Sequence, residues 1–248
     1  MNPAEFATLV EAEKTLWWFR GMRKILFRLL DPLAEGREVR RALEAGCGTG
    51  HFARMVEGRY GWPVFPTDIS AEGLDYARRA GVPRLARADI ASLPYAAEAF
   101  DVVLSLDVLV HFQRGAEGPA LAEFARVLKP GGLLVLRVAA LDILRSRHSE
   151  FAHERQRFSR RRLERAVSQH GFRTLRCTYA NALLMPVALA RFRIWEPLLR
   201  KPPQSGTAPV APWLDRMLYL ALAAESAWIG AGMNFAAGQS LILIAVKE

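Results

Sequence analysis

The chain has 248 residues, of which 51% are hydrophobic and 24% charged, and its formal net charge is +9. This length suits one α/β domain with an elaboration and can bury a sizeable core. The two cysteines, Cys47 and Cys177, exclude a disulfide framework and a cysteine metal site, so a reducing cytoplasm is the simplest setting. The first residues lack the basic-then-apolar pattern of a signal peptide.

Residues 1–40 precede the first predicted strand. Four leucines between Leu26 and Leu33 follow the spacing i, i+3, i+4, i+7, which predicts a helix that packs on a sheet. Just before this helix, residues 17–19 are three consecutive aromatic residues. They cannot all face one side of a helix. At least one aromatic side chain is therefore expected to touch something outside the core.

A glycine-rich turn follows the short apolar run at residues 42–43. Residues 44–50 read Glu-Ala-Gly-Cys-Gly-Thr-Gly, and apolar residues at helical spacing come next. Glycines at alternate positions let the backbone turn tightly and approach a ligand, because no Cβ intrudes. The pattern predicts the first strand, turn and helix of a doubly wound sheet, with a ligand above the carboxyl end of the strand.

The next predicted strand ends at Asp68, 18 residues after Gly50. A carboxylate at that place accepts hydrogen bonds from ribose hydroxyls. The alternative is that Asp68 caps the helix that begins near Ala71. Further strands are predicted at residues 84–90, 100–105 continuing through 112, and 133–138, the last after the turn Lys-Pro-Gly-Gly.

Two more strands are predicted at residues 173–179 and 239–246, separated by residues 180–238. This insertion is apolar at both ends, and residues 217–238 carry one charge, Glu225. The stretch approaches the length of a membrane-spanning helix, but a span there would separate the last strand from the sheet. We therefore expect a substrate-pocket wall, a dimer interface or a surface that dips into a bilayer, with simple core packing as the alternative.

The motifs in residues 41–138 resemble those of class I S-adenosylmethionine (SAM)-dependent methyltransferases. The likeness is to the small-molecule "methyltransferase type 11" or ubiquinone-biosynthesis-like group. It implies an α/β, doubly wound, seven-stranded, mostly parallel sheet of Rossmann-like type, with an N-terminal helical lid and an α-helical insertion before the last strand. The implied parts are a lid at 1–40, a SAM-binding core at 41–179, a helical insertion at 180–238 and a final core strand at 239–248.

The resemblance also implies roles for residues. The glycine turn holds the methionine part of SAM, Asp68 binds the ribose and Asp89 reaches the adenine amino group. An aromatic–arginine segment folds over the cofactor as a lid, in which an arginine such as Arg23 pairs with the methionine carboxylate. The implied cofactor residues are Glu44, Gly46, Cys47, Gly48, Gly50, Asp68, Ile69, Asp89, Ile90, Leu106, Trp18 and Arg23.

His111 is the candidate general base, because an imidazole can take a proton from an attacking hydroxyl or ammonium. The alternative is that His111 caps a helix or packs. His153, in the segment after the fifth strand, is the second candidate. The five histidines show no metal-ligand spacing.

The resulting hypothesis is SAM-dependent, in-line methyl transfer to a small, hydrophobic or lipid-linked acceptor. One alternative is an RNA methyltransferase that uses the basic run Arg155–Arg165, although the same run also fits the solvated face of a helix. Another is a membrane-peripheral SAM-binding accessory protein without catalysis. Nucleic acid is not the favoured partner, a homodimer and membrane association stay open, and O-, N- and C-methylation all fit.

Overall fold

A computed structural model describes residues 6–199 and 205–248. The first five residues of the predicted lid and residues 200–204 of the predicted insertion lie outside this part. Within the described residues, seven strands form one sheet in the order β3-β2-β1-β4-β5-β7-β6. The strands are β1 (Ala42–Ala45), β2 (Val64–Asp68), β3 (Ala86–Arg87), β4 (Phe100–Leu106), β5 (Leu128–Ala139), β6 (Phe172–Ala180) and β7 (Ser240–Lys247).

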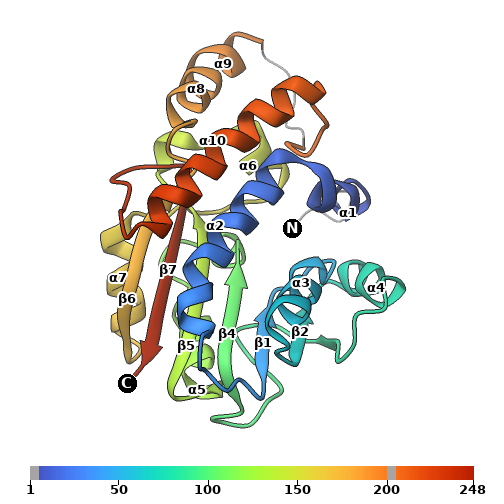
Figure 1. Ribbon diagram of the computed structural model, residues 1–248, viewed down its shortest axis with the longest axis vertical. Coiled ribbons are helices and arrows are strands. Elements are labelled where there is room, and N and C mark those ends of the chain that lie inside the picture. Colours follow the sequence, from blue (N-terminus) through green and yellow to red (C-terminus); the bar gives the residue numbers. More distant parts are fainter. Residues whose placement is uncertain (1–5, 200–204) are drawn as a thin grey trace.

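The sheet confirms the predicted fold class. Strands β1 to β5 pair in parallel, and β7 runs antiparallel between β5 and β6. The strand order reverses between β1 and β4, which is where doubly wound folds place their ligands. In Figure 1 the arrow of β4 points upward, toward the end of the sheet at which helix α10 (Pro212–Gly230) lies.

Helices cover both faces of the sheet (Figure 1). Apolar residues of α2, α3 and α10 pack on one face, and those of α5 and α7 pack on the other. The helices of the described residues are α1 (Phe6–Thr15), α2 (Trp17–Ala34), α3 (His51–Tyr60), α4 (Ala71–Arg79), α5 (Gly118–Val127), α6 (Arg147–Phe151), α7 (Arg160–Ser168), α8 (Met185–Ala190), α9 (Glu196–Leu199) and α10 (Pro212–Gly230). Short 3-10 helices, η2 (Leu109–His111) and η3 (Asp142–Leu144), and a π-helix, η4 (Arg191–Trp195), complete the set.

The leucine stripe predicted before the first strand lies on α2. Leu26 and Leu30 are fully buried and share a core with Val102 of β4 and Leu222 of α10. Gly21 lets α10 come close, since a Cβ there would lie 2.4 Å from the Leu222 Cδ1 atom. Helix α10 (residues 212–230) therefore packs along α2 although almost 200 residues separate them in sequence.

Three predicted strands differ in length from the observed ones. Strand β3 contains only Ala86–Arg87, the two residues that pair with Thr67 and Asp68 of β2. Strand β4 ends at Leu106, where Asp107 adopts a positive φ of 59° and the chain turns into η2. Strand β5 begins early, since Leu128 already pairs with Phe100 before the register shifts.

The predicted insertion is helical in the described residues. Helices α8 and α9, together with η4, lie beyond the end of the sheet in the upper part of Figure 1, and α10 runs from there onto the face that α2 covers. None of the helices in the described ranges combines the length and apolar character needed to cross a membrane.

Candidate functional site

A cavity of about 680 Å³ lies at the carboxyl ends of the parallel strands, where the strand order reverses. Its walls come from the turn after β1, the ends of β2 and β4, helices α1 and α2, and the start of the insertion. Segments far apart in sequence thus enclose one space, with the glycine turn at one end and residues 191–192 among the insertion residues that line it.

The glycine turn fits closely under the segment after β4. Gly46 has φ of +88°, and a Cβ on it would lie 2.2 Å from the Val108 Cγ2 atom. The backbone N–H groups of Gly46 and Cys47 both donate to the Thr67 carbonyl oxygen, at 2.7 and 3.0 Å. Only glycine satisfies both the positive φ and this close approach at position 46.

Asp68 is held at the end of β2 by two backbone groups. Its Oδ2 atom accepts from the Gly48 N–H at 2.7 Å, and its Oδ1 atom accepts from the Ser70 N–H at 2.8 Å. The N-cap of α4 is Ser70, whose hydroxyl accepts from the Gly73 N–H. Capping is thus done by Ser70, and each Asp68 oxygen keeps a lone pair for another donor.

Two buried acids flank the glycine turn. Glu44 is the third residue of β1 and has 3% of its surface exposed, and its Oε2 atom has no hydrogen-bond partner among the described residues. Glu13 of α1 accepts a hydrogen bond from the Thr49 hydroxyl. Burial raises the pKa of Glu13 to about 7, and burial and the nearby Glu13 carboxyl hold the pKa of Glu44 well above its usual range. This end of the cavity therefore favours a ligand that donates hydrogen bonds or carries positive charge.

Arg23 joins α2 to this end of the cavity. Its Nη1 atom donates to the Glu13 carbonyl oxygen at 3.0 Å and lies 3.2 Å from the His51 Nε2 atom. Burial and the neighbouring Arg23 charge lower the pKa of His51 to about 4, so this imidazole is neutral at neutral pH and accepts from the guanidinium.

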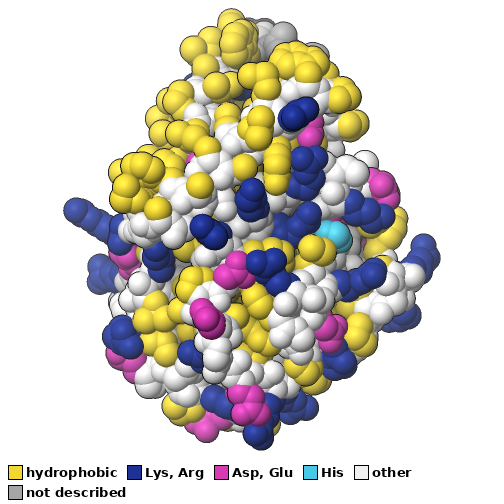
Figure 2. All heavy atoms as spheres, in the orientation of Figure 1, with side chains coloured by type: hydrophobic (Ala, Val, Ile, Leu, Met, Phe, Trp, Pro, Cys, Tyr) yellow, Lys and Arg dark blue, Asp and Glu magenta, His cyan; other side chains and the backbone are white. Residues whose placement is uncertain are grey.

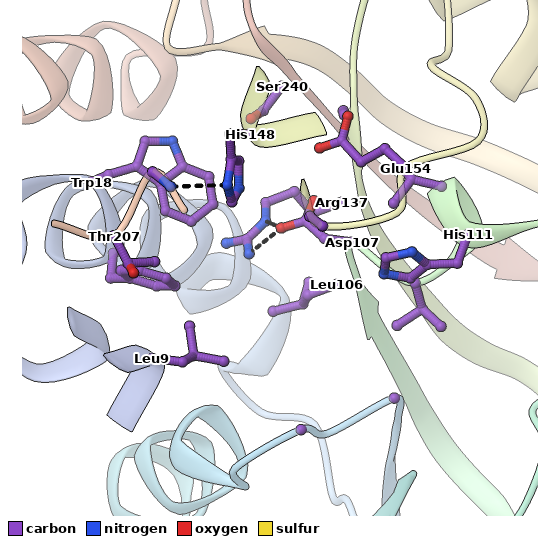
Figure 3. Close-up of a pocket in the computed structure, with 18 of the residues that line it drawn as sticks. Leu9, Trp18, Leu106, Asp107, His111, Arg137, His148, Glu154, Thr207 and Ser240 are labelled. Atoms are coloured by element: carbon purple, nitrogen blue, oxygen red, sulfur yellow. Dashed lines mark hydrogen bonds and ion pairs between the residues drawn. The ribbon is translucent and has the colours of Figure 1, made fainter. Parts of the chain in front are cut away.

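The middle of the cavity holds an ion pair that the sequence did not predict. Arg137 of β5 donates from Nε and Nη2 to the Asp107 Oδ2 atom, with an Nε–Oδ2 distance of 2.8 Å. The Arg137 guanidinium also lies 4.9 Å from the centre of the Trp18 ring. In Figure 3 this pair lies between Trp18 on one side and His111 on the other.

His111 is part of η2 and lines the cavity. Its Nδ1 atom lies 3.3 Å from the His153 carbonyl oxygen. Because a carbonyl only accepts, Nδ1 carries the proton and Nε2 is the acceptor in the neutral ring. Burial lowers the pKa of His111, which favours the neutral ring at physiological pH.

Most of the predicted cofactor residues meet at this cavity. Its lining includes Trp18, Arg23, Glu44, Gly46, Cys47, Gly48, Asp68, Ile69, Asp89, Ile90 and Leu106. Gly50 is not in the lining; it has φ of +69° and begins α3, where a Cβ would meet Val82. The structure does not bring the His153 side chain to the cavity, since that side chain is exposed and meets His111 only through its backbone.

Asp89 and Ile90 follow β3 in a turn. The Asp89 Oδ1 atom accepts from the Ala91 N–H at 2.9 Å, and Ile90 is 5% exposed. Cys47 is buried, and burial together with the nearby Glu44 raises the pKa of its thiol, so that the thiol stays protonated. These side chains shape the cavity wall, and Cys47 does not have the character of a reactive thiolate.

Sequence reasoning missed Glu13, His51, Asp107 and Arg137. None belongs to a local motif, because each reaches the cavity only when separate elements pack together. The positive φ of Asp107 is a conformation that aspartate adopts more readily than most residues, but that signal is weak.

The basic run at residues 155–165 does not form one face. Arg157 is buried and donates to the Ala140 carbonyl oxygen, and Arg162 pairs with Glu117. Arg161 and Arg165 are exposed on α7. Arg157 and Arg162 thus stabilise the fold through contacts with other segments of the chain. In the described residues, no group of three or more His, Cys, Asp or Glu side chains is arranged to hold a metal ion.

Comparison with known proteins agrees with this geometry. The family described as "Methyltransferase domain" matches residues 43–136. A malonyl-[acyl-carrier protein] O-methyltransferase of Enterobacter lignolyticus is 32% identical over 158 residues, which are 59% of this chain and 62% of that protein. The chain thus spans less than two thirds of the length of this curated relative.

Solved structures share the fold at low sequence identity. A putative methyltransferase in complex with the Haloferax volcanii Trm112 activator has a TM-score of 0.61 and 17% identity, and the match covers 100% of this chain and 98% of that one. A geranyl diphosphate methyltransferase in complex with SAM has a TM-score of 0.57 and 16% identity, covering 90% and 87%.

Proposed function

We propose that the chain transfers a methyl group from SAM to a small-molecule acceptor, since residues 43–136 match the methyltransferase-domain family. The observation that carries this proposal is the unpartnered Oε2 atom of Glu44, buried beside the glycine turn. A buried carboxyl oxygen without a hydrogen-bond partner is costly, and a cationic amino group on a ligand would satisfy it and favour ionisation of the carboxyl group.

The residues of the cavity fit SAM. Glu44 and the turn at Gly46–Gly48 would hold the amino-acid half, with Arg23 directed at its carboxylate. Asp68 would accept from the ribose hydroxyls, since its two oxygens are already aligned by backbone donors. Asp89 and the Ile90 backbone would meet the adenine. These assignments are proposals drawn from the lining of the cavity.

SAM supplies, when bound, an electrophilic methyl group on a positively charged sulfonium. The chain's contribution is to orient the acceptor and to exclude water. Trp18 and Leu106 give that part of the cavity an apolar wall, which favours a reaction in which charge is neutralised. The Arg137–Asp107 pair holds Trp18 in place through its stacked guanidinium.

We assign His111 as the general base for an acceptor that starts protonated. Its Nε2 lone pair is available because Nδ1 faces a carbonyl oxygen. The lowered pKa leaves the ring neutral at physiological pH, so it is ready to take a proton. An acceptor that arrives as an anion, such as a carboxylate, would need no base.

The proposed acceptor is small and hydrophobic or lipid-linked. Support comes from the apolar insertion, whose Phe192 lines the cavity, and from the size of the cavity. The Enterobacter relative is named for O-methylation of malonyl-[acyl-carrier protein], so a carboxylate attached to a carrier protein is the first acceptor to test.

The test has two stages. Calorimetry should show SAM binding that weakens when Glu44 is replaced by glutamine. Formation of S-adenosylhomocysteine is then followed with malonyl-[acyl-carrier protein], medium-chain carboxylic acids and lipid phenols. Binding of SAM without turnover on any acceptor would favour a non-catalytic accessory protein, and no binding at all would remove the proposed function.

A further inference from the structure

The exposed apolar side chains of this chain gather on the insertion. Of the fourteen large hydrophobic side chains exposed in the described residues, eleven lie between residues 183 and 233. We call them the apolar surface: Leu183, Val187, Ile194, Trp195, Leu198, Val210, Trp213, Met217, Leu220, Trp228 and Met233. Figure 2 shows hydrophobic side chains covering the part of the molecule formed by α8, α9 and α10.

Helix α10 exposes large apolar side chains along its outer side. Trp213, Met217 and Leu220 point outward with 66%, 61% and 55% of their surface exposed. Its buried positions are Leu222, Glu225, Ser226 and Ile229, so the inner side carries polar as well as apolar side chains. A helix on the surface of a soluble protein normally turns its polar side to water. The exposed apolar side chains of α10 therefore favour contact with an apolar partner.

A row of cations runs beside this helix on α2. Arg20, Lys24 and Arg28 follow each other at a spacing of four, so they lie along one side of the helix. Arg20 and Lys24 lie over the Tyr219 ring of α10, at 4.4 and 5.8 Å from its centre. A Cβ on Gly230 would lie 2.2 Å from the Arg28 Nε atom. The row thus borders the apolar surface along the length of α10.

Among the described residues, the acids of this segment form an ion pair with Arg20 but none with Lys24 or Arg28. Glu196 accepts from the Arg147 N–H, Asp215 pairs with Arg20, and Glu225 is fully buried. Two copies of the chain that met through this face would bring like charges together. An anionic surface with an apolar interior matches both the cations and the exposed tryptophans, because tryptophan favours the boundary between headgroups and acyl chains.

The apolar surface also adjoins the cavity. In η4, Arg191 and Phe192 line the cavity, whereas Ile194 and Trp195 are exposed on the surface. Within η4, residues that line the cavity therefore lie within one helical turn of residues that belong to the apolar surface.

We propose that the apolar surface docks on an anionic phospholipid bilayer, with α10 lying in the plane of the interface and Lys24 and Arg28 facing the headgroups. The docking does not depend on the methyl-transfer activity. It places the η4 wall of the cavity next to the membrane, which is the place from which a lipid-linked acceptor would enter.

The experiment measures binding of the full chain to vesicles of phosphatidylcholine alone and of phosphatidylcholine with phosphatidylglycerol, by flotation and tryptophan fluorescence. Binding is expected to be at least about tenfold tighter to the anionic vesicles and to weaken with salt. The variant Trp213→Gln/Met217→Gln/Leu220→Gln should lose at least about tenfold in affinity. Leu175→Gln, which changes an exposed leucine of β6 outside the surface, should bind as the parent chain does.

A second pair of variants tests the charges. Lys24→Glu/Arg28→Glu should weaken binding to anionic vesicles about tenfold or more, whereas Arg161→Glu/Arg165→Glu on α7 makes the same change of charge elsewhere and should have little effect. SAM binding and circular dichroism check that each variant is folded. Equal loss in both pairs would point to net charge alone and overturn the proposal. So would a lack of vesicle binding, or a dimer in sedimentation equilibrium that the triple variant dissociates.

Discussion

Thr49 donates its hydroxyl hydrogen bond to Glu13, so helix α1 is tied to the glycine turn through an acid whose pKa burial raises to about 7. This contact links two separate segments that do not belong to one sequence motif. Helix α1 lines the cavity, so its docking is expected to depend on the protonation of Glu13.

Docking of α1 is expected to weaken as the pH rises through about 7. Because the pKa of Glu13 is raised in the docked state, the docked helix holds the proton more tightly than the free segment does. The stabilisation is fully present below the usual glutamate pKa and is lost on ionisation, although Arg23, Arg137 and Lys14 nearby reduce the effect. Amide exchange of α1 in the SAM-free chain should therefore increase from about pH 6 to about pH 8.

Glu13→Gln is the matched control for that measurement. The amide oxygen still accepts from the Thr49 hydroxyl but does not titrate, so exchange of α1, corrected for the intrinsic effect of pH, should become independent of pH. The same pH dependence in this variant would assign the effect to another group.

Gly46→Ala should abolish SAM binding, because its Cβ would collide with Val108 at 2.2 Å and the residue has a positive φ. Gly61→Ala is the control, since Gly61 also has a positive φ but nothing lies within 4 Å of the added Cβ. The control should lose about 1–2 kcal/mol of stability from backbone strain and keep its affinity for SAM. Calorimetry and thermal melting measure the two effects, and equal affinities in both variants would contradict the expectation.

Asp68→Ala should weaken SAM binding by about 1–3 kcal/mol, since a buried ribose hydroxyl would lose its partner. The change also frees the backbone N–H groups of Gly48 and Ser70. Asp68→Asn keeps an oxygen for one of these donors and separates the two effects. If calorimetry found both variants as tight as the parent chain, Asp68 would not belong to the ribose site.

His111→Gln should lower kcat for a protonated acceptor while leaving SAM affinity within about twofold, since a general base contributes about 10²–10⁴-fold. In the parent chain, activity should be retained at neutral pH and fall as the pH drops through the lowered pKa of His111, below its usual value near 6.5. Stopped assays across pH with a hydroxyl and a carboxylate acceptor check both points. Full turnover of the hydroxyl acceptor by His111→Gln would remove the residue as a base.

Local patterns were sufficient for much of the core. The glycine turn depends on the backbone freedom of its own glycines, and the buried side of α2 depends on the helical spacing of its leucines. Both features could therefore be predicted from the sequence. Strand β3 was predicted too long because only Ala86 and Arg87 pair with β2, and no local pattern records how far two strands pair. The early start of β5 likewise depends on the pairing of Leu128 with Phe100.

The sequence by itself determined the glycine turn and its place directly after the first strand, because both depend on the order of residues within one short segment. Tertiary structure alone decided that Glu13 and Arg137 enter the cavity and that α10 exposes Trp213 while it buries Glu225. Burial and pairing of a charge depend on which distant segments pack around it, and that is a property of the folded chain as a whole.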